Sequence, residues 1–423
     1  MSEQMEKRWT GYTKTDWLWI GLAATTLVPL VAVRFLGLAS ESAFAMATST
    51  GLAIVAAAFC LSWGVEGLET VMPQGVALAI LALIEVAPEY SFEVILAYRQ
   101  QSTLAAASMT GANRLLLGFG WPLLMLTAYI SARRKGQRYT EIQLGREQIG
   151  QIVFLLFASL YAFVIVIKQS ISLVDSAILV LIYGFYIFAS LRLGDAKCEE
   201  REEEEGVGVA ARTKKLRGVG KVFAIAAFLA FGAFVLYAGA EPFIDAILSI
   251  AHSLGVSQFI LIQWVAPFLS EFPESVTAYI WAASVLAAAK GLSNLISSKL
   301  NQWTLLIAAI PIAFSLGGGK LQVLHFNAQV RDEIFITAAQ SLFGSVLLLT
   351  MRFNLKKATI LLVLFLIQFF IPSESIRLVL AWTYLVLTAL YVAARWQRFH
   401  LLQEFRSPPG HVDHWRSGGS NET

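Results

Sequence analysis

Long apolar runs dominate this sequence and recur along most of its 423 residues. A membrane-crossing α-helix needs about 20 mostly apolar residues, because the hydrocarbon core of a bilayer is about 30 Å thick. The runs therefore predict an all-α integral membrane protein with about 12 transmembrane helices. The predicted helices cover residues 17–36, 43–63, 75–97, 111–130, 147–167, 171–192, 221–239, 257–286, 301–318, 333–351, 357–371 and 376–394.

Composition excludes several other classes of protein. Hydrophobic residues make up 57% of the chain and charged residues 14%, whereas a soluble domain carries about 25% charged residues. The net charge of +3 gives no reason to expect a nucleic-acid partner. Cys60 and Cys198 are the two cysteines and suggest neither a disulfide framework nor a zinc site. The N-terminal segment lacks the pattern of a cleaved signal peptide.

Basic residues indicate the orientation in the membrane. They follow the predicted helices four, six, ten and twelve, and they also precede the first helix. Since short loops rich in Lys and Arg stay in the cytoplasm, both termini are predicted to be cytoplasmic. Arg99 and Arg114 run against this rule. The compact loops fit a multi-pass protein of a bacterial cytoplasmic membrane.

Two landmarks indicate an internal repeat. The pair Pro88-Glu89 recurs as Pro273-Glu274, and Arg146-Glu147 recurs as Arg331-Asp332 at an identical offset along the chain. The offset spans five predicted helices, and an odd number reverses the direction of the second copy. The sequence therefore predicts two inverted five-helix repeats with an extra helix at each end, an architecture found in many secondary transporters.

This repeat divides the chain into five predicted parts. They are an N-terminal segment with an extra helix (1–42), a first repeat (43–192), a cytoplasmic charged loop (193–220), a second repeat (221–371), and an extra helix with a C-terminal tail (372–423). The charged loop carries the acidic run 199–205 and then a basic run, which is typical of a solvated linker.

The first candidate site consists of Glu85, Glu89 and Glu93 around Pro88. Their i, i+4, i+8 spacing places them near one face of an unbroken helix. Proline removes a helical hydrogen bond and interrupts the helix. Carboxylates at membrane depth cost several kcal/mol and normally face a polar cavity. We therefore predict that these glutamates meet a cation path.

The second candidate site lies inside another apolar run, with a predicted helix break at Pro273. Its polar residues are Ser270, Glu271, Glu274, Ser275 and Thr277. Oxygen-rich sites suit hard cations such as calcium, and paired carboxylates also suit protons. A structural alternative is that the prolines are simple kinks and that the glutamates pair with Arg99, Lys290 or loop water.

A helix with small and amide residues follows each cluster. The second of these contains Ser297, Ser298, Asn301 and Gln302, which are candidates to line the path from the opposite side. Helix packing through small residues is the alternative, since membranes favour it. Asn301 is the residue for which the two interpretations are most evenly balanced.

At its duplicated Pro-Glu pairs the sequence resembles the sodium/calcium exchanger family of the cation/calcium antiporter superfamily. The resemblance covers about residues 43–371 and implies two inverted repeats with a broken helix in each. It implies that Glu89 and Glu274 are metal-binding glutamates. Where the family has Gly-Thr-Ser before Pro-Glu, this chain has Ile84-Glu85-Val86 and Leu269-Ser270-Glu271. The extra carboxylates favour proton coupling or another cation.

We therefore expect a secondary active cation antiporter that exchanges calcium or another cation for sodium or protons. A sodium/proton exchanger on the same fold and a cation channel are the alternatives. No enzymatic motif such as His-Glu-x-x-His occurs in the sequence, so we expect no enzyme and no cofactor. The expected partners are the lipid bilayer and inorganic cations, and the sequence carries no signal for an oligomeric state.

Overall fold

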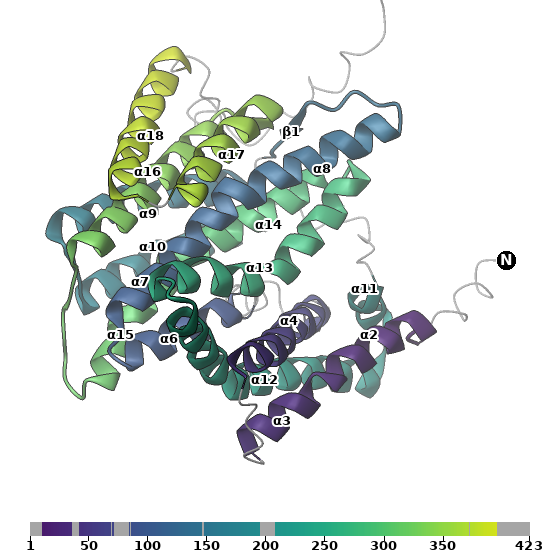
Figure 1. Ribbon diagram of the computed structural model, residues 1–423. Helices are drawn as coiled ribbons and strands as arrows, with labels where there is room; N and C mark the ends of the chain where they lie inside the picture. The colour runs from purple at the N-terminus through teal and green to yellow at the C-terminus, as the bar shows by residue number, and fades with distance from the viewer. Residues whose placement is uncertain are drawn as a thin grey trace, which may run out of the picture.

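The computed structural model describes residues 11–35, 42–68, 70–71, 84, 86–145, 148–194, 208–371 and 373–395. This part of the chain is almost entirely helical (Figure 1). Eight of its helical segments are long and apolar enough to cross a membrane. They are Lys14–Ala32, Ala43–Leu68, Ser102–Arg134, Gln148–Lys168, Leu173–Leu191, Gly218–Leu254, Ala288–Gly317 and Glu374–Arg395.

The helices follow one another in two similar series. The first series is α2 (Lys14–Thr25), α3 (Leu27–Phe35), α4 (Ala43–Leu68), α6 (Ala87–Tyr98), α7 (Ser102–Leu115), α8 (Trp121–Arg134), α9 (Gln148–Lys168) and α10 (Leu173–Gly194). The second is α11 (Gly208–Lys215), α12 (Gly218–Leu254), α13 (Gln258–Ser284), α14 (Ala288–Asn301), α15 (Ile307–Gly317), α16 (Ala328–Leu348), α17 (Leu355–Phe370) and α18 (Glu374–Arg395). Two π-helical stretches, η1 (Leu116–Gly120) and η2 (Gln302–Leu306), join α7 to α8 and α14 to α15.

Several helices are longer than the hydropathy pattern predicts. α12 continues to Leu254 instead of ending near residue 239, although it contains Glu241, Pro242 and Asp245. α7 and α14 begin well before the predicted spans 111–130 and 301–318. Their early turns carry polar residues that face protein rather than lipid, and a hydropathy window cannot recognise such residues as membrane-embedded.

The predicted charged loop is not wholly a solvated linker. Its acidic run lies outside the described residues, but its basic end forms α11. Val209, Ala210 and Thr213 of this helix are buried, and the helix packs against α4. The hydroxyl groups of Tyr12 and Thr213 are 3.0 Å apart and hydrogen-bond each other. This hydrogen bond therefore attaches the residues just before α2 to α11, which lies between the two predicted repeats.

The two series show the inverted repeat in their helix boundaries. α7 and α14 have the same length, and each runs directly into a π-helical stretch, η1 or η2, which also match in length. Insertion of an extra residue widens a helical turn, and such π-helical turns are frequent at functional sites. Arg146-Glu147, one of the landmarks of the sequence argument, lies outside the described residues.

Two small sheets fasten the repeats to each other. β1 (Glu141–Gln143) pairs antiparallel with β4 (Arg352–Asn354), and β2 (Ser170–Ile171) pairs antiparallel with β3 (Leu324–His325). Each sheet therefore takes one strand from each repeat. Because α9 separates β1 from β2, and α16 separates β3 from β4, the sheets lie at opposite ends of these helices. An inverted duplication produces this arrangement, in which each strand pairs with a strand of the other repeat.

α7 and α13 cross in very close contact at the centre of the molecule. A Cβ atom added at Gly111 would lie 1.8 Å from the backbone oxygen of Gln263. Pro267 has no N–H to donate to that oxygen four residues earlier in α13. A glycine at position 111 therefore lets the two helices approach at the place where proline leaves a carbonyl without its helical partner.

The peripheral helices lie at opposite sides of this centre. α2 and α3 lie beside α4 and α12, while α18 packs against α16 at the other side of the molecule (Figure 1). Trp17 and Trp19 on α2 and Trp382 on α18 are large apolar side chains that are more than half exposed. Such exposure suits a surface that faces lipid.

Candidate ion-binding site

The two Pro-Glu pairs lie on α6 and α13. Pro88 stands in the first turn of α6, where a proline costs no hydrogen bond. α13 continues as a helix through Pro267 and Pro273, so the predicted break at Pro273 is not observed. The hydroxyl group of Thr277 donates to the carbonyl of Pro273 at 3.2 Å, and the packed neighbouring helices support the local distortion.

The carboxylates of the first repeat are deeply buried. Glu89 is 2% exposed and Glu93 is fully buried, whereas Glu85 lies outside the described residues. Oε2 of Glu89 and both carboxylate oxygens of Glu93 have no hydrogen-bond partner among the described residues. Ser270 lies near Glu89, and Ser108 lies near Glu93. These acceptor oxygens need a proton or a cation, because a buried charge without a partner is very costly.

The carboxylates of the second repeat are supplied with donors. Oε1 of Glu271 accepts a hydrogen bond of 3.1 Å from the amide of Gln302. Glu274 is partly buried, and its two oxygens accept hydrogen bonds from Asn294 at 3.2 Å and Ser298 at 2.9 Å. Amide and hydroxyl groups of α14 and η2 therefore hold the glutamates of α13.

The four glutamates of the candidate site that the structure describes interact electrostatically one after another, and we call them the glutamate series. Glu93 interacts with Glu89, Glu89 with Glu271, and Glu271 with Glu274. The series begins at a fully buried carboxylate in one repeat and ends at a partly exposed one in the other. Since like charges at low dielectric disfavour one another, all four carboxylates cannot be ionised together without bound cations.

The remaining predicted residues surround this series. Ser270 and Ser298 are buried, while Ser275 and Thr277 are partly buried on α13. Asn301 is buried, and its side-chain oxygen accepts a hydrogen bond of 3.2 Å from the hydroxyl group of Tyr90. The structure therefore brings Asn301 of the second repeat into contact with α6 of the first.

A buried lysine that was not predicted from the sequence also lies at this interface. Nζ of Lys299 donates to the backbone oxygen of Asn113 at 2.9 Å and to its side-chain oxygen at 2.7 Å. It also lies 4.7 Å from the centre of the Trp303 ring, and it interacts electrostatically with Glu271. A cation inside an apolar segment is unusual, and that signal was present in the sequence.

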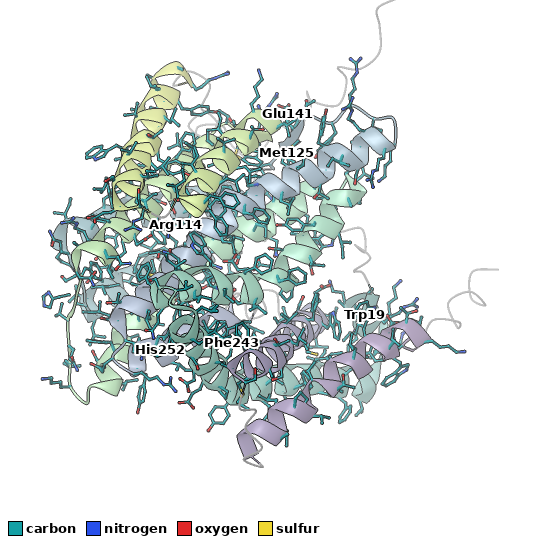
Figure 2. The ribbon with its side chains drawn as sticks, in the orientation of Figure 1. Trp19, Arg114, Met125, Glu141, Phe243 and His252 are labelled. Carbon is teal, nitrogen blue, oxygen red and sulfur yellow. The ribbon has the colours of Figure 1, made fainter. Side chains whose placement is uncertain are left out.

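The two arginines that ran against the orientation rule have ion-pair partners. Arg114 lies in the middle of the helical bundle (Figure 2) and pairs with Glu333 at 2.6 Å, and both side chains are buried. Arg99 pairs with Glu241 at 2.5 Å and Asp245 at 2.6 Å. Its pKa is raised, chiefly by the hydrogen bond to Asp245. Among the described residues, Arg99 therefore pairs with Glu241 and Asp245 and forms no ion pair with Glu89 or Glu93, which argues against Arg99 as the partner of these two glutamates.

The described residues contain no group of three or more histidine, cysteine, aspartate or glutamate side chains that could hold a metal ion. The glutamates are thus an extended series rather than a compact cage. Such a series offers carboxylate, hydroxyl and amide oxygens one after another across the repeat interface. Hard cations and protons bind to these same oxygens, so the arrangement is suited to their passage.

Comparison with known proteins places the chain among exchangers. The family model described as "Sodium/calcium exchanger protein" matches residues 42–192 and 224–397, which is most of the sequence. No match was found among curated protein sequences. The family match covers both Pro-Glu pairs and the helices that follow them.

Solved structures with the same fold are also exchangers. One described as the H+/Ca2+ exchanger CAX is 32% identical, with a TM-score of 0.85 over 94% of this chain and 98% of its own. The Ca2+/H+ antiporter YfkE is 16% identical, with a TM-score of 0.57 over 87% and 98%. The sodium-calcium exchanger NCX_Mj is 17% identical, with a TM-score of 0.51 over 76% and 97%. The last two show a likeness of fold alone.

Proposed function

The chain belongs to the sodium/calcium exchanger protein family, and on this premise we propose that it is a secondary active antiporter exchanging Ca2+ for protons. Glu89 and Glu274 are proposed as the main cation ligands, with Glu271, Ser270 and Asn301 beside them. Sodium/proton exchange on the same fold is the second candidate, because carboxylates and amide oxygens bind either ion. We propose the bacterial cytoplasmic membrane as its location, with both termini in the cytoplasm.

One observation supports this proposal most directly. Carboxylate oxygens of Glu89 and Glu93 are buried at the repeat interface without hydrogen-bond partners among the described residues. In a membrane interior such oxygens are found where ions or protons pass. The H+/Ca2+ exchanger CAX, at 32% identity over nearly the whole chain, favours Ca2+ and protons as the two substrates.

Competition for the same oxygens would produce the exchange. A carboxylate series that has bound Ca2+ holds few protons, because both ions neutralise the same charge. Release of Ca2+ leaves buried negative charges that must take up protons before the site can reorient. Rocking of one repeat against the other would expose the series to each side in turn. The site can reorient only when Ca2+ or protons neutralise its charges. It therefore carries Ca2+ in one direction and protons in the other.

The test is Ca2+ uptake into proteoliposomes that contain the purified protein. We expect an imposed proton gradient to drive uptake, and we expect Glu89→Gln or Glu274→Gln to abolish it, since an amide neither ionises nor binds Ca2+ strongly. Glu141→Gln is the matched control, because Glu141 lies on β1 in an exposed ion pair with Arg352. This variant should transport like the wild type.

The outcomes separate the candidates. Normal Ca2+ uptake by both Glu89→Gln and Glu274→Gln would exclude the proposed site. Uptake driven by a sodium gradient alone would replace protons with sodium as the coupling ion. If neither gradient drives Ca2+ flux, sodium/proton exchange replaces Ca2+ exchange as the proposed function. Single-channel currents would instead indicate a channel.

A further inference from the structure

Lys299 joins α14 of the second repeat to α7 of the first through buried polar contacts. Its ammonium group on α14 reaches the backbone and side-chain oxygens of Asn113 on α7, at 2.9 and 2.7 Å. Lys299 and Asn113 are both fully buried. Each is the third-last residue of its helix, and the two helices are equal in length. By their place within α7 and α14 they are therefore equivalent, and they meet at the interface between the repeats.

The surroundings of Lys299 are those of a charged ammonium group. Both oxygen partners are acceptors, and the ring of Trp303 lies at a distance typical of a cation–π interaction, 4.7 Å. Glu271 adds a negative charge within electrostatic range. The neighbouring guanidinium of Arg114 is itself paired with Glu333. The two oxygen partners, the Trp303 ring and Glu271 favour the charged form of Lys299, whereas burial and the nearby Arg114 oppose it.

The two oxygens of Asn113 are ligands that a free monovalent cation would use. Carbonyl oxygens replace the hydration shell of such ions in selective sites. Here an ammonium group already occupies both oxygens, and it also compensates part of the negative charge of the glutamate series. A second monovalent cation at the same place would meet a like charge in a medium of low dielectric constant.

We propose that the Lys299 ammonium is a tethered cation that takes the place of one free monovalent cation at the repeat interface and so prevents sodium from binding there. This inference rests on the proposed function in that it treats the glutamate series as an ion site. The tethered cation adds a determinant of ion selectivity to that site. It implies that Ca2+ exchange by this chain does not depend on sodium.

The experiment measures whether sodium binds to the purified protein. Thermal unfolding is followed in detergent with NaCl or choline chloride at equal ionic strength, for the wild type and for Lys299→Ala. We expect sodium to leave the wild type unchanged and to raise the apparent melting temperature of Lys299→Ala by about 2 °C, because a ligand that binds the folded state stabilises it. In proteoliposomes, sodium should inhibit Ca2+ uptake by this variant at a concentration about tenfold lower than for the wild type.

The chain provides a matched control on the same helix. Lys290 of α14 also lies 4.7 Å from the centre of a tryptophan ring, that of Trp281, but it is only partly buried. Lys290→Ala removes a lysine and a cation–π contact without opening the interface, and it should remain insensitive to sodium. Lys299→Arg keeps the tethered charge and should also remain insensitive.

Three results would overturn the inference. They are sodium stabilisation of the wild type, equal insensitivity of folded Lys299→Ala, and the same sodium response in Lys290→Ala. The first of these is decisive even if Lys299→Ala does not fold, because it uses the wild type alone. The binding measurement does not require Ca2+ transport. A failure of the proposed antiport therefore appears in the flux assay, and a failure of the tethered cation appears in the unfolding assay.

Discussion

The two repeats share a backbone but divide the chemistry of the site between them. α6 supplies Glu89 and Glu93, whose buried oxygens include three without partners among the described residues. α13 supplies Glu271 and Glu274, and α14 and η2 supply the amide and hydroxyl donors that hold them. The equivalent positions 113 and 299 carry an amide in the first repeat and an ammonium in the second.

This difference shows how a duplicated scaffold becomes an asymmetric site. Identical repeats would place like charges opposite each other at the interface, which low dielectric penalises. Here the first repeat leaves negative charge available, and the second stabilises negative charge and contributes a cation. The charges are reversed at the next position, where the first repeat has Arg114, paired with Glu333, and the second has Leu300.

The largest effect is expected from breaking the buried ion pair between Arg114 on α7 of the first repeat and Glu333 on α16 of the second. Arg114→Gln leaves Glu333 with Arg377, which lies 3.3 Å away, as its remaining cation. We expect a loss of about 3 kcal/mol, because removal of one partner leaves a buried charge poorly compensated. The measurement is the apparent melting temperature in detergent.

The exposed pair of Arg352 and Glu141 gives the control for Arg114→Gln. Their side chains are 49% and 30% exposed, so Arg352→Gln should cost about 0–1 kcal/mol. If Arg114→Gln melts at the same temperature as Arg352→Gln, the buried pair does not stabilise the packing of the two repeats against each other.

An intermediate effect is expected from Gly111→Ala. The added Cβ would lie 1.8 Å from the backbone oxygen of Gln263, and backbone cannot yield as a flexible side chain does. We expect a loss of about 1–3 kcal/mol or more together with reduced transport. The equivalent position in the second repeat is Ser297, which is partly buried.

Ser297→Ala therefore tests the comparison from the other side. It removes only a hydroxyl group from a position that already accommodates a side chain, so it should change the unfolding free energy by no more than about 0.5 kcal/mol. Equal behaviour of Gly111→Ala and Ser297→Ala would mean that the close crossing of α7 and α13 is not a constraint on the first repeat.

The smallest effect sharpens the contrast between the glutamates. Glu89→Gln replaces a buried acceptor that lacks a partner, so without divalent cations it should raise the unfolding free energy by about 1 kcal/mol. Glu274→Gln places an amide against the donors Asn294 and Ser298 and should lower it by about 1 kcal/mol. The two variants are compared by thermal unfolding in a chelator. Shifts of the same sign would show that the two glutamates have similar surroundings.

The sequence predicted the membrane class, the approximate positions of the long helices and the inverted repeat. These properties follow from local composition and from a spacing along the chain, which need no knowledge of the packing. The predictions failed where polar residues lie inside membrane helices. Examples are the early turns of α7 and α14 and the C-terminal half of α12, whose Glu241 and Asp245 pair with Arg99.

The sequence also pointed to Glu89, Glu271 and Glu274 as site residues, because charged groups in apolar runs are rare and costly, and their role in ion binding stays a prediction. It did not show which of their oxygens lack partners, and it passed over Lys299. A lysine in an apolar run is equally rare and costly. Its importance, however, depends on Asn113, which lies far away along the chain in the other repeat. Glu85 lies outside the described residues, so its role stays a prediction.

The sequence by itself thus determined that the chain spans a bilayer as two opposed copies of one helical unit, each with buried glutamates. The tertiary structure alone decided which charges are paired, which carboxylate oxygens lack a hydrogen-bond partner among the described residues, and that β1 pairs with β4 and β2 with β3. The physical reason is the distance along the chain over which each kind of information acts. Apolar periodicity acts along the chain, whereas the charge of a buried group is balanced by neighbours that only folding brings from the other repeat.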